Sequence, residues 1–360
     1  MGRGLLLKNP QKIMVRATNW IGDAVMSLPA LEALRARFPE AEIVLVAKPW
    51  VAELYWHLPA VTRQLVYDPQ GEHRGVRGFW KLIQALRAEH FDAVILLQNA
   101  FHAAWMAWRA RIPVRVGYAC DGRGALLTES VEVPSPAAYG HQAYYYLQLL
   151  FRAGLIEKPE PIQEIRLSVD EAERKWAAKH LEGLGLGGPR VLVGIHPGAS
   201  FGPAKRWLPE RFASLADRLI GGVHADVLIF GSRAERPVAE EIAHAMEHTP
   251  VIFAGETSLR QLMALMARCS LIVTNDSGPM HVAAALGLPL VAVFGSTDER
   301  TTGPVSRRAR VVRHPTACSP CALRACPIDF RCMKGVTADA AYTAALELLN
   351  QWGVTHEHSA

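Results

Sequence analysis

The chain has 360 residues, of which 50% are hydrophobic, and its formal net charge at pH 7 is +5. This much apolar material supports sizeable cores and excludes a disordered chain, and the length is typical of two domains. The small positive excess is compatible with an anionic substrate or a membrane surface, but it is too weak to indicate nucleic acid binding, so no nucleic acid partner is expected. No apolar run is long enough for a transmembrane helix or, at the N-terminus, for a signal peptide, so we expect a cytoplasmic location.

The first half of the chain alternates short apolar strands with amphipathic helices. Strands are predicted at residues 12–17, 42–46, 64–67, 92–97 and 114–117, and helices at 24–38, 50–58, 78–90, 100–110 and 139–154. This alternation is typical of a doubly wound parallel sheet. Pro29 lies in the early turns of the first helix, where a kink can occur.

Asp23 lies between the end of the first predicted strand and the following helix. A carboxylate in this position either caps the helix or faces a cleft and accepts a proton. The residues alone leave both interpretations open.

Residues 157–161 contain two prolines and no apolar periodicity, which predicts a linker that continues to residue 168. After it the alternation resumes, with helices predicted at 170–184 and 338–352 and strands at 191–195, 226–231, 251–253, 271–273 and 290–295. We therefore expect domains at 1–168 and 169–337, followed by a closing helix and a disordered tail within 338–360.

One loop of the second half has the composition of a diphosphate site. His196-Pro197-Gly198-Ala199-Ser200 follows a strand, and Lys205-Arg206 comes soon after it. Glycine lets a ligand approach the backbone, and the cations offset its charge. The loop does not have the Gly-Lys-Ser/Thr ending of a Walker loop. Glu235 opens a later helix, where it either bonds a ribose or simply favours the helix N-terminus.

The stretch from Thr274 to His281 follows a buried strand and opens a helix of small residues. A helix start with free N–H groups is suited to phosphate, so Asp276-Ser277-Gly278 is a candidate ligand site. Neither half carries Gly-x-Gly-x-x-Gly after its first strand, which disfavours a dinucleotide enzyme. The chain also has no Asp-x-Asp pair, which is consistent with a site that neutralises a leaving group without metal.

Three motifs together resemble the ADP-heptose:lipopolysaccharide heptosyltransferase family, most closely its type II enzymes. They are residues 19–29, residues 196–199 with 205–207, and residues 274–281 with 283–286. The resemblance covers most of the chain. It implies an α/β protein of GT-B architecture, with two Rossmann-like doubly wound parallel-sheet domains facing across a cleft and the closing helix packed back on the N-terminal domain. It also implies inverting transfer with no metal or cofactor.

The same resemblance implies a role for each motif residue. Asp23 would be the general base, and Lys205, or else Arg206, would stabilise the leaving diphosphate. Glu235 would hold the ribose or adenosine and Asp276 the heptose hydroxyls. The remaining expected donor contacts are His196, Gly198, Ser200, Ser277, Gly278, Met280 and His281. The expected acceptor contacts are Asn19, Trp20, Arg74, Arg77, Arg115 and Arg123, for which a solvated basic face is the alternative.

The expected reaction moves heptose from ADP-L-glycero-D-manno-heptose to the first heptose of a lipid A–Kdo–heptose acceptor. A monomer in peripheral contact with the inner membrane would perform it. Three alternatives stay open: type I transfer to Kdo, a GT-B sugar-nucleotide 2-epimerase, and a non-catalytic nucleotide-sugar binding protein.

Four cysteines, Cys318, Cys321, Cys326 and Cys332, lie close together near the C-terminus. The opening Cys-x-x-Cys has the spacing of a zinc site, and four thiolates could complete a tetrahedron. We expect free thiols here rather than bound zinc, and isolated core residues at Cys120 and Cys269.

Overall fold

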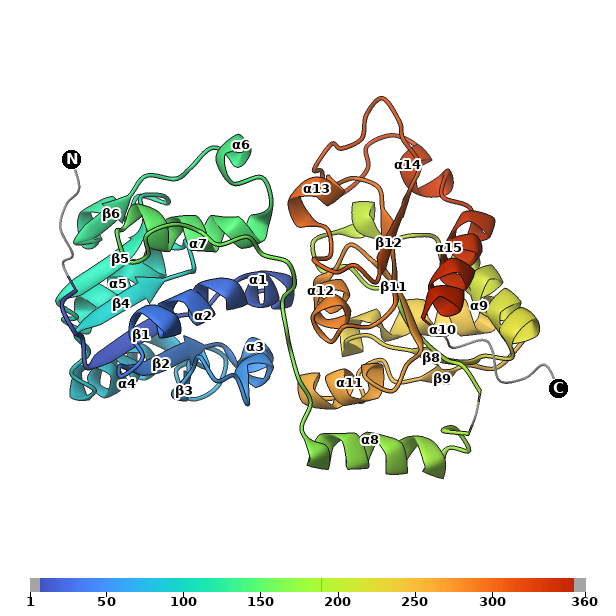
Figure 1. Ribbon diagram of the computed structural model, residues 1–360, viewed down its shortest axis with the longest axis horizontal. Coiled ribbons are helices and arrows are strands. Elements are labelled where there is room, and N and C mark those ends of the chain that lie inside the picture. Colours follow the sequence, from blue (N-terminus) through green and yellow to red (C-terminus); the bar gives the residue numbers. More distant parts are fainter. Residues whose placement is uncertain (1–6, 189, 353–360) are drawn as a thin grey trace. The chain divides into compact units, whose positions relative to one another are not determined.

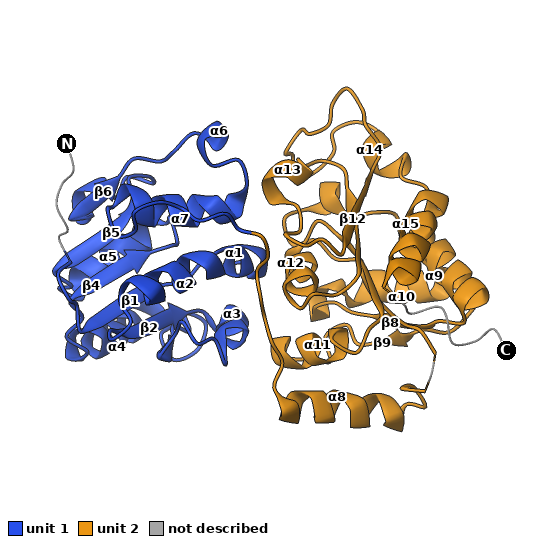
Figure 2. Cartoon of the chain, in the orientation of Figure 1, with its two compact units in different colours: residues 1–162 blue, residues 163–360 orange. Residues whose placement is uncertain are grey.

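The computed structural model describes residues 7–188 and 190–352 and divides the chain into two units, residues 1–162 and 163–360 (Figure 1, Figure 2). The division expected after residue 168 therefore lies after Ile162. The last residues of the predicted linker belong to the second unit. The Leu167 amide donates to the Ala285 carbonyl at 2.8 Å, and the Arg260 guanidinium donates to the Ser168 carbonyl at 2.9 Å.

The first unit is a six-stranded parallel sheet in the order β3-β2-β1-β4-β5-β6. Its strands are β1 (Lys12–Arg16), β2 (Glu42–Ala47), β3 (Arg63–Val66), β4 (Ala93–Leu96), β5 (Val114–Tyr118) and β6 (Glu129–Val131). Its helices are α1 (Ile21–Met26), α2 (Leu28–Arg37), α3 (Pro49–Ala52), α4 (Gly75–Ala88), α5 (Phe101–Arg109), α6 (Pro136–Tyr139) and α7 (Gln142–Arg152). Helices α4 and α5 cover one face of the sheet, while α1, α2 and α7 lie on the other (Figure 1).

The helix predicted at 24–38 is two helices that meet at Ser27. Pro29 has no amide hydrogen and cannot continue the hydrogen-bond ladder of α1, so it sits in the first turn of α2 instead. The Ser27 hydroxyl donates to the Ala24 carbonyl at 2.8 Å and satisfies a group at the end of α1. This break leaves α1 as a short helix whose first turn carries Asp23.

The second unit has the same topology, a six-stranded parallel sheet in the order β12-β11-β10-β7-β8-β9. Its strands are β7 (Leu192–His196), β8 (Asp226–Ile229), β9 (Val251–Ile252), β10 (Leu271–Asn275), β11 (Leu290–Phe294) and β12 (Ala309–Arg313). Its helices are α8 (Glu171–Gly183), α9 (Pro209–Val223), α10 (Arg236–Ala245), α11 (Leu259–Met266), α12 (Gly278–Ala285), α13 (Glu299–Thr302), α14 (Arg331–Lys334) and α15 (Ala338–Gln351). Every residue of β7, β10 and β11 is buried, as expected for central strands with helices on both faces.

The closing helix α15 belongs to the second unit, so the expectation that it packs on the N-terminal domain is wrong. It contacts α9 and strands β10 to β12. Its buried side, with Ala341, Ala345 and Leu348, is part of the core that also contains Val291 and Phe212. Because the alanine side chains are small, α15 can lie close to the sheet of the second unit. The predicted disorder of residues 353–360 lies outside the described residues.

Leu348→Ala is expected to destabilise the second unit by about 2–5 kcal/mol, because it removes a fully buried side chain and leaves a cavity. Denaturant unfolding of the whole chain would measure the loss. Thr343→Ala, at an exposed position of the same helix, is the control and should change stability by less than about 0.5 kcal/mol. Equal effects of the two changes would contradict the packing of α15.

Within the part of the chain that the structure describes, no helix combines the length and the apolar character needed to cross a bilayer.

Candidate active site

Each sheet reverses its strand order once, between β1 and β4 in the first unit and between β7 and β10 in the second. In parallel α/β sheets, ligands bind beyond the carboxyl ends of the strands at such a point. Asp23 follows β1, while His196 ends β7 and Asp276 follows β10. The topology therefore places the predicted motif residues at the expected ligand-binding edge of each unit.

Asp23 lines a recess of about 510 Å³ in the first unit, which we call the Asp23 recess. Its lining combines amide, hydroxyl and aromatic side chains, a composition suited to a sugar. The residues are Thr18, Asn19, Trp20, Asp23, Leu97, Gln98, Asn99, Val133, Tyr139, Gln142, Tyr145 and Tyr146. Asn19 and Trp20, two predicted acceptor contacts, thus lie beside Asp23.

The Asp23 carboxylate is not the cap of α1, because Trp20 holds the capping position. The hydroxyl of Tyr146 on α7 donates to Asp23 Oδ1 at 3.0 Å. Burial, followed by the nearby Asp23 charge, raises the pKa of Tyr146 well above its ordinary value, so the phenol keeps its proton and remains a donor. This contact fixes one carboxylate oxygen at the wall of the recess.

Arg123 supports the floor of the recess rather than lining it. Its guanidinium is fully buried and donates to the Tyr118 carbonyl at 2.8 Å and to Asn99 Oδ1 at 3.2 Å. Asn99 in turn donates to the Tyr145 hydroxyl at 2.7 Å. A buried arginine with its donors satisfied in this way orders the Asn99 and Tyr145 side chains that face the recess.

Three other predicted acceptor residues do not line the recess. Arg74 and Arg77 are exposed at the start of α4. Arg115 lies near the amino end of β5, where its guanidinium donates to the carbonyls of Leu126 and Ile112, both at 2.6 Å. These hydrogen bonds hold the loop that joins β5 to β6 against the start of β5.

In the second unit, Lys205 Nζ lies 2.5 Å from Asp276 Oδ2. Both side chains are largely withdrawn from water, at 12% and 4% exposed. The Thr297 hydroxyl also donates to Asp276 Oδ2, at 2.6 Å. Arg206, the alternative cation, is exposed and donates weakly to the Ala199 carbonyl at 3.5 Å. The geometry therefore favours Lys205 as the cation of this site.

Asn275 fixes the loops on either side of this ion pair. Its Oδ1 accepts from the Trp207 amide at 2.9 Å, and its Nδ2 donates to the Pro197 carbonyl at 2.7 Å. An amide side chain can do both because it carries an acceptor and a donor at once. The buried Trp207 indole, which donates to the Val336 carbonyl at 2.9 Å, anchors the end of the Lys205 loop.

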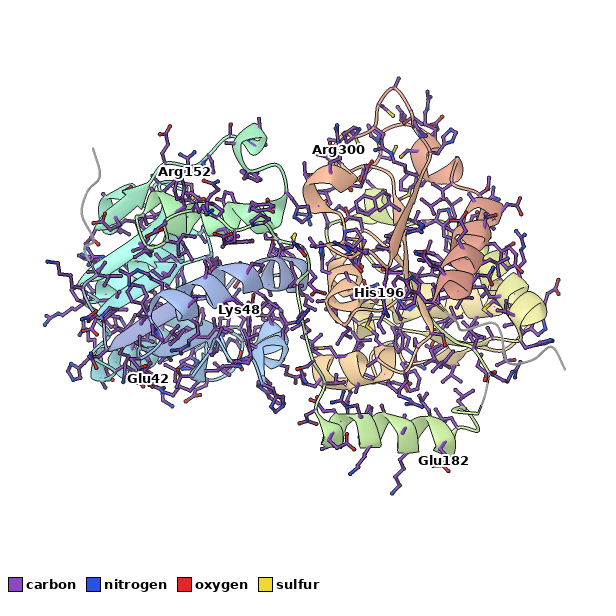
Figure 3. The ribbon with its side chains drawn as sticks, viewed as in Figure 1. Glu42, Lys48, Arg152, Glu182, His196 and Arg300 are labelled. Atoms are coloured by element: carbon purple, nitrogen blue, oxygen red, sulfur yellow. The ribbon has the colours of Figure 1, made fainter. Side chains whose placement is uncertain are left out.

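His196 and Glu235 form a second buried pair, and Figure 3 shows His196 inside the second unit. His196 Nε2 lies 3.8 Å from Glu235 Oε2, which accepts hydrogen bonds from the Ser232 amide and hydroxyl, both at 2.8 Å. Burial lowers the pKa of His196, so the imidazole is neutral near pH 7. Burial alone would raise the pKa of Glu235, but the charge that His196 carries when it is protonated, together with the Ser232 donors, outweighs burial and lowers the pKa. Glu235 is therefore a fixed carboxylate acceptor.

Given the ADP-heptose donor that the sequence resemblance implies, Gly198→Ala is expected to weaken ADP binding about tenfold or more. A Cβ at this position would lie 1.8 Å from Glu235 Oε1, so the carboxylate would have to leave its Ser232 donors. Calorimetric titration with ADP measures the effect. Gly221→Ala, where a Cβ meets nothing within 4 Å, is the matched control and should bind ADP normally. Unchanged affinity in Gly198→Ala would argue against a donor contact by Glu235.

The remaining predicted donor residues lie at the start of α12 and in the loop after β7. The Ser277 hydroxyl is 3.1 Å from that of Thr274, and the first turn of α12 begins at Gly278. His281 is buried and Ser200 is exposed. Met280 is 0% exposed, so its side chain contributes to the interior rather than to a ligand surface.

The four clustered cysteines line one small apolar cavity of about 70 Å³. Among the described residues, no three of their sulfur atoms lie within 4.8 Å of one another, so a closed tetrathiolate arrangement is not present. The loop that carries them packs against the residues of the candidate donor site instead. The Ala204 amide donates to the Arg324 carbonyl at 3.0 Å, and the Cys321 amide donates to the Ser296 carbonyl at 3.0 Å. The loop therefore supports both Lys205 and Thr297.

The model of glycosyltransferase family 9 (heptosyltransferase) matches residues 79–330. The chain belongs to this family. It is 35% identical over 316 residues to lipopolysaccharide heptosyltransferase 2 of Escherichia coli (strain K12), a match that covers 84% of this chain and 88% of the relative. These findings confirm the predicted family and show that the chain is a glycosyltransferase.

Two solved structures of this family share the fold. The structure of Escherichia coli ADP-heptose lps heptosyltransferase II matches with a TM-score of 0.82 and 32% identity, over 95% of this chain and 99% of that one. The family 9 glycosyltransferase from Veillonella parvula DSM 2008 matches with a TM-score of 0.84 and 25% identity, over 96% and 99%. With the two six-stranded parallel sheets, these matches confirm the predicted GT-B fold class.

The sequence did not point to Tyr146, Thr297 and Ser232, which hold carboxylates of the candidate site in place. Each donates to a carboxylate that the sequence did indicate. For Tyr146 the available signal was the run of three tyrosines at residues 144–146, since a buried phenol requires a hydrogen-bond partner.

Proposed function

We propose that this chain transfers heptose from ADP-L-glycero-D-manno-heptose to the first heptose of the lipopolysaccharide inner core, with inversion and without metal. The likeness to lipopolysaccharide heptosyltransferase 2 supports the acceptor class, and the likeness to the structure of ADP-heptose lps heptosyltransferase II supports the donor. The observation that carries the proposal is the buried Lys205–Asp276 pair beside the start of α12. A departing diphosphate needs a cation and backbone N–H donors, and both are present there.

In this mechanism each unit supplies one part of the chemistry. Asp23, held by Tyr146, removes the proton from the acceptor hydroxyl as the sugar–phosphate bond breaks. Lys205 offsets the charge that develops on the diphosphate, and the first turn of α12 receives a phosphate. Asp276 accepts from the heptose hydroxyls and Glu235 from the ribose. Attack opposite to the leaving group inverts the anomeric centre.

The proposed acceptor, lipid A–Kdo–heptose, is anchored in lipid. A cytoplasmic protein that acts on it works in peripheral contact with the inner membrane, and we propose that this one does so as a monomer. The net charge of +5 favours approach to an anionic membrane surface.

Mass spectrometry of truncated lipopolysaccharides incubated with ADP-heptose and the protein tests the proposal. A mass gain of one heptose on the acceptor that ends in heptose, persisting in the presence of a chelator, is the expected result. Transfer only to the acceptor that ends in Kdo would assign type I activity, and isomerised donor without acceptor would assign an epimerase. Activity that needs added divalent metal would contradict the metal-free step.

A further inference from the structure

The outer sides of α4 and α5 form a basic and aromatic surface on the first unit. The inner sides of both helices are apolar and bury Leu82, Ile83 and Ala104 against the same face of the sheet. At the margins of these helices Trp80, Arg87 and Arg109 are half-buried, while Trp108 and the following Arg111 are exposed. We call this the α4–α5 face.

Arg87, Trp108, Arg109 and Arg111 line a recess of about 330 Å³ on this face, the arginine recess. The Arg109 guanidinium contacts two indoles, with its Cζ 4.4 Å from the Trp80 ring centre and 5.5 Å from that of Trp108. The Arg87 Nε donates to the Arg109 carbonyl at 2.9 Å, which ties the two helices together. The recess is thus ordered by its own contacts.

None of these three arginines has an ion pair with a carboxylate among the described residues. The nearest acids in the sequence serve other groups: Glu89 pairs with Lys12 and Arg63, and Asp92 accepts from two backbone amides. The Arg109 Nε atom is buried and has no hydrogen-bond partner within the described ranges. Three neighbouring guanidinium groups without a counter-charge repel one another, and an anion that enters the recess relieves this cost.

We propose that the arginine recess binds the phosphate groups of anionic phospholipids and seats the α4–α5 face on a bilayer. Guanidinium groups match phosphate geometry through paired hydrogen bonds. Trp108 is 45% exposed beside them, and an indole that is both apolar and able to donate is favoured at the membrane–water interface. A free phosphate ion gains nothing from that exposed ring. The inference rests on the proposed function, in which the acceptor is anchored in lipid.

Sedimentation with vesicles tests the surface. Phosphatidylcholine vesicles, with and without phosphatidylglycerol, are compared at equal total lipid and at low and high salt. We expect the protein to bind the anionic vesicles preferentially and salt to weaken binding. The double variant Arg87→Gln/Arg111→Gln should bind about tenfold or more weakly, because each basic residue near an anionic leaflet adds to the attraction. The control Lys175→Gln/Lys179→Gln removes two exposed charges from α8 and should bind like the wild type.

Transfer of heptose to a deacylated, water-soluble acceptor separates this inference from the proposed function. The double variant of the arginine recess should keep wild-type transfer rates in that assay, with only a small loss of thermal stability from the missing Arg87 hydrogen bond to the Arg109 carbonyl. No preference for anionic vesicles, or equal losses in the α8 control, would overturn the docking surface even if transfer is intact. Tight binding of inorganic phosphate that the double variant abolishes, without vesicle binding, would also overturn it in favour of a site for free phosphate.

Discussion

Asp23→Asn is expected to lower the rate of heptose transfer about 10²–10⁴-fold, the usual worth of a positioned general base. The amide has the size of the carboxylate and can still accept the Tyr146 hydroxyl hydrogen bond of 3.0 Å, so the recess keeps its shape. It cannot accept the proton of the incoming hydroxyl. Turnover is measured by mass spectrometry of the acceptor, and ADP affinity by calorimetry. Since the proposed donor-binding residues lie in the second unit, ADP affinity should stay unchanged.

Tyr146→Phe is the companion variant, because it keeps the base and removes only its hydrogen-bond donor. It should lower activity far less than Asp23→Asn. The charged carboxylate loses a partner that favours it, so the acid limb of the pH–rate profile should move to higher pH. Near-normal turnover by Asp23→Asn would refute the assignment of the base. An unmoved acid limb in Tyr146→Phe would leave the tyrosine a purely structural role.

The predictable part of the fold consists of buried central strands and the helices between them. Strand β11 is a continuous apolar run and β10 begins with one, and such runs are recognisable in the sequence. The edge strands β6 and β12 were missed. β6 has only three residues, and β12, Ala-Arg-Val-Val-Arg, is half-buried along its whole length. At an edge, pairing with one neighbour decides the conformation, and local sequence carries little trace of it.

The candidate site likewise has a part that the sequence predicts and a part that it does not. Asp23, Lys205 and Asp276 follow strong strands, so the topology alone brought them to a ligand-binding edge. Tyr146 is 123 positions from the carboxylate it supports, and such a contact has no local signal. The positive charge of Arg123 suggested a ligand contact, but its side chain is buried. A cation in a loop suggests such a contact whether its side chain faces solvent or the interior. Side-chain direction is a product of tertiary packing.

Lys205→Met should have two separable consequences. Turnover should fall about 10²–10³-fold, the typical loss when one preorganised charge-stabilising group is removed. Stability should also fall, by about 3 kcal/mol, because Asp276 is only 4% exposed and would be left as a buried charge with no cation. Denaturant unfolding measures the second effect, and the mass-spectrometric transfer assay measures the first.

The double variant Lys205→Met/Asp276→Asn then distinguishes the two roles of the lysine. The amide introduced by Asp276→Asn can still accept the Thr297 hydroxyl hydrogen bond, and no buried charge remains, so stability should return to within about 1 kcal/mol of the wild type. Transfer should stay as low as in Lys205→Met or fall further, because the cation that offsets the leaving diphosphate is still missing. Recovery of transfer together with stability would mean that Lys205 serves only to hold Asp276, and the charge on the leaving group would then have to be met by the start of α12 alone.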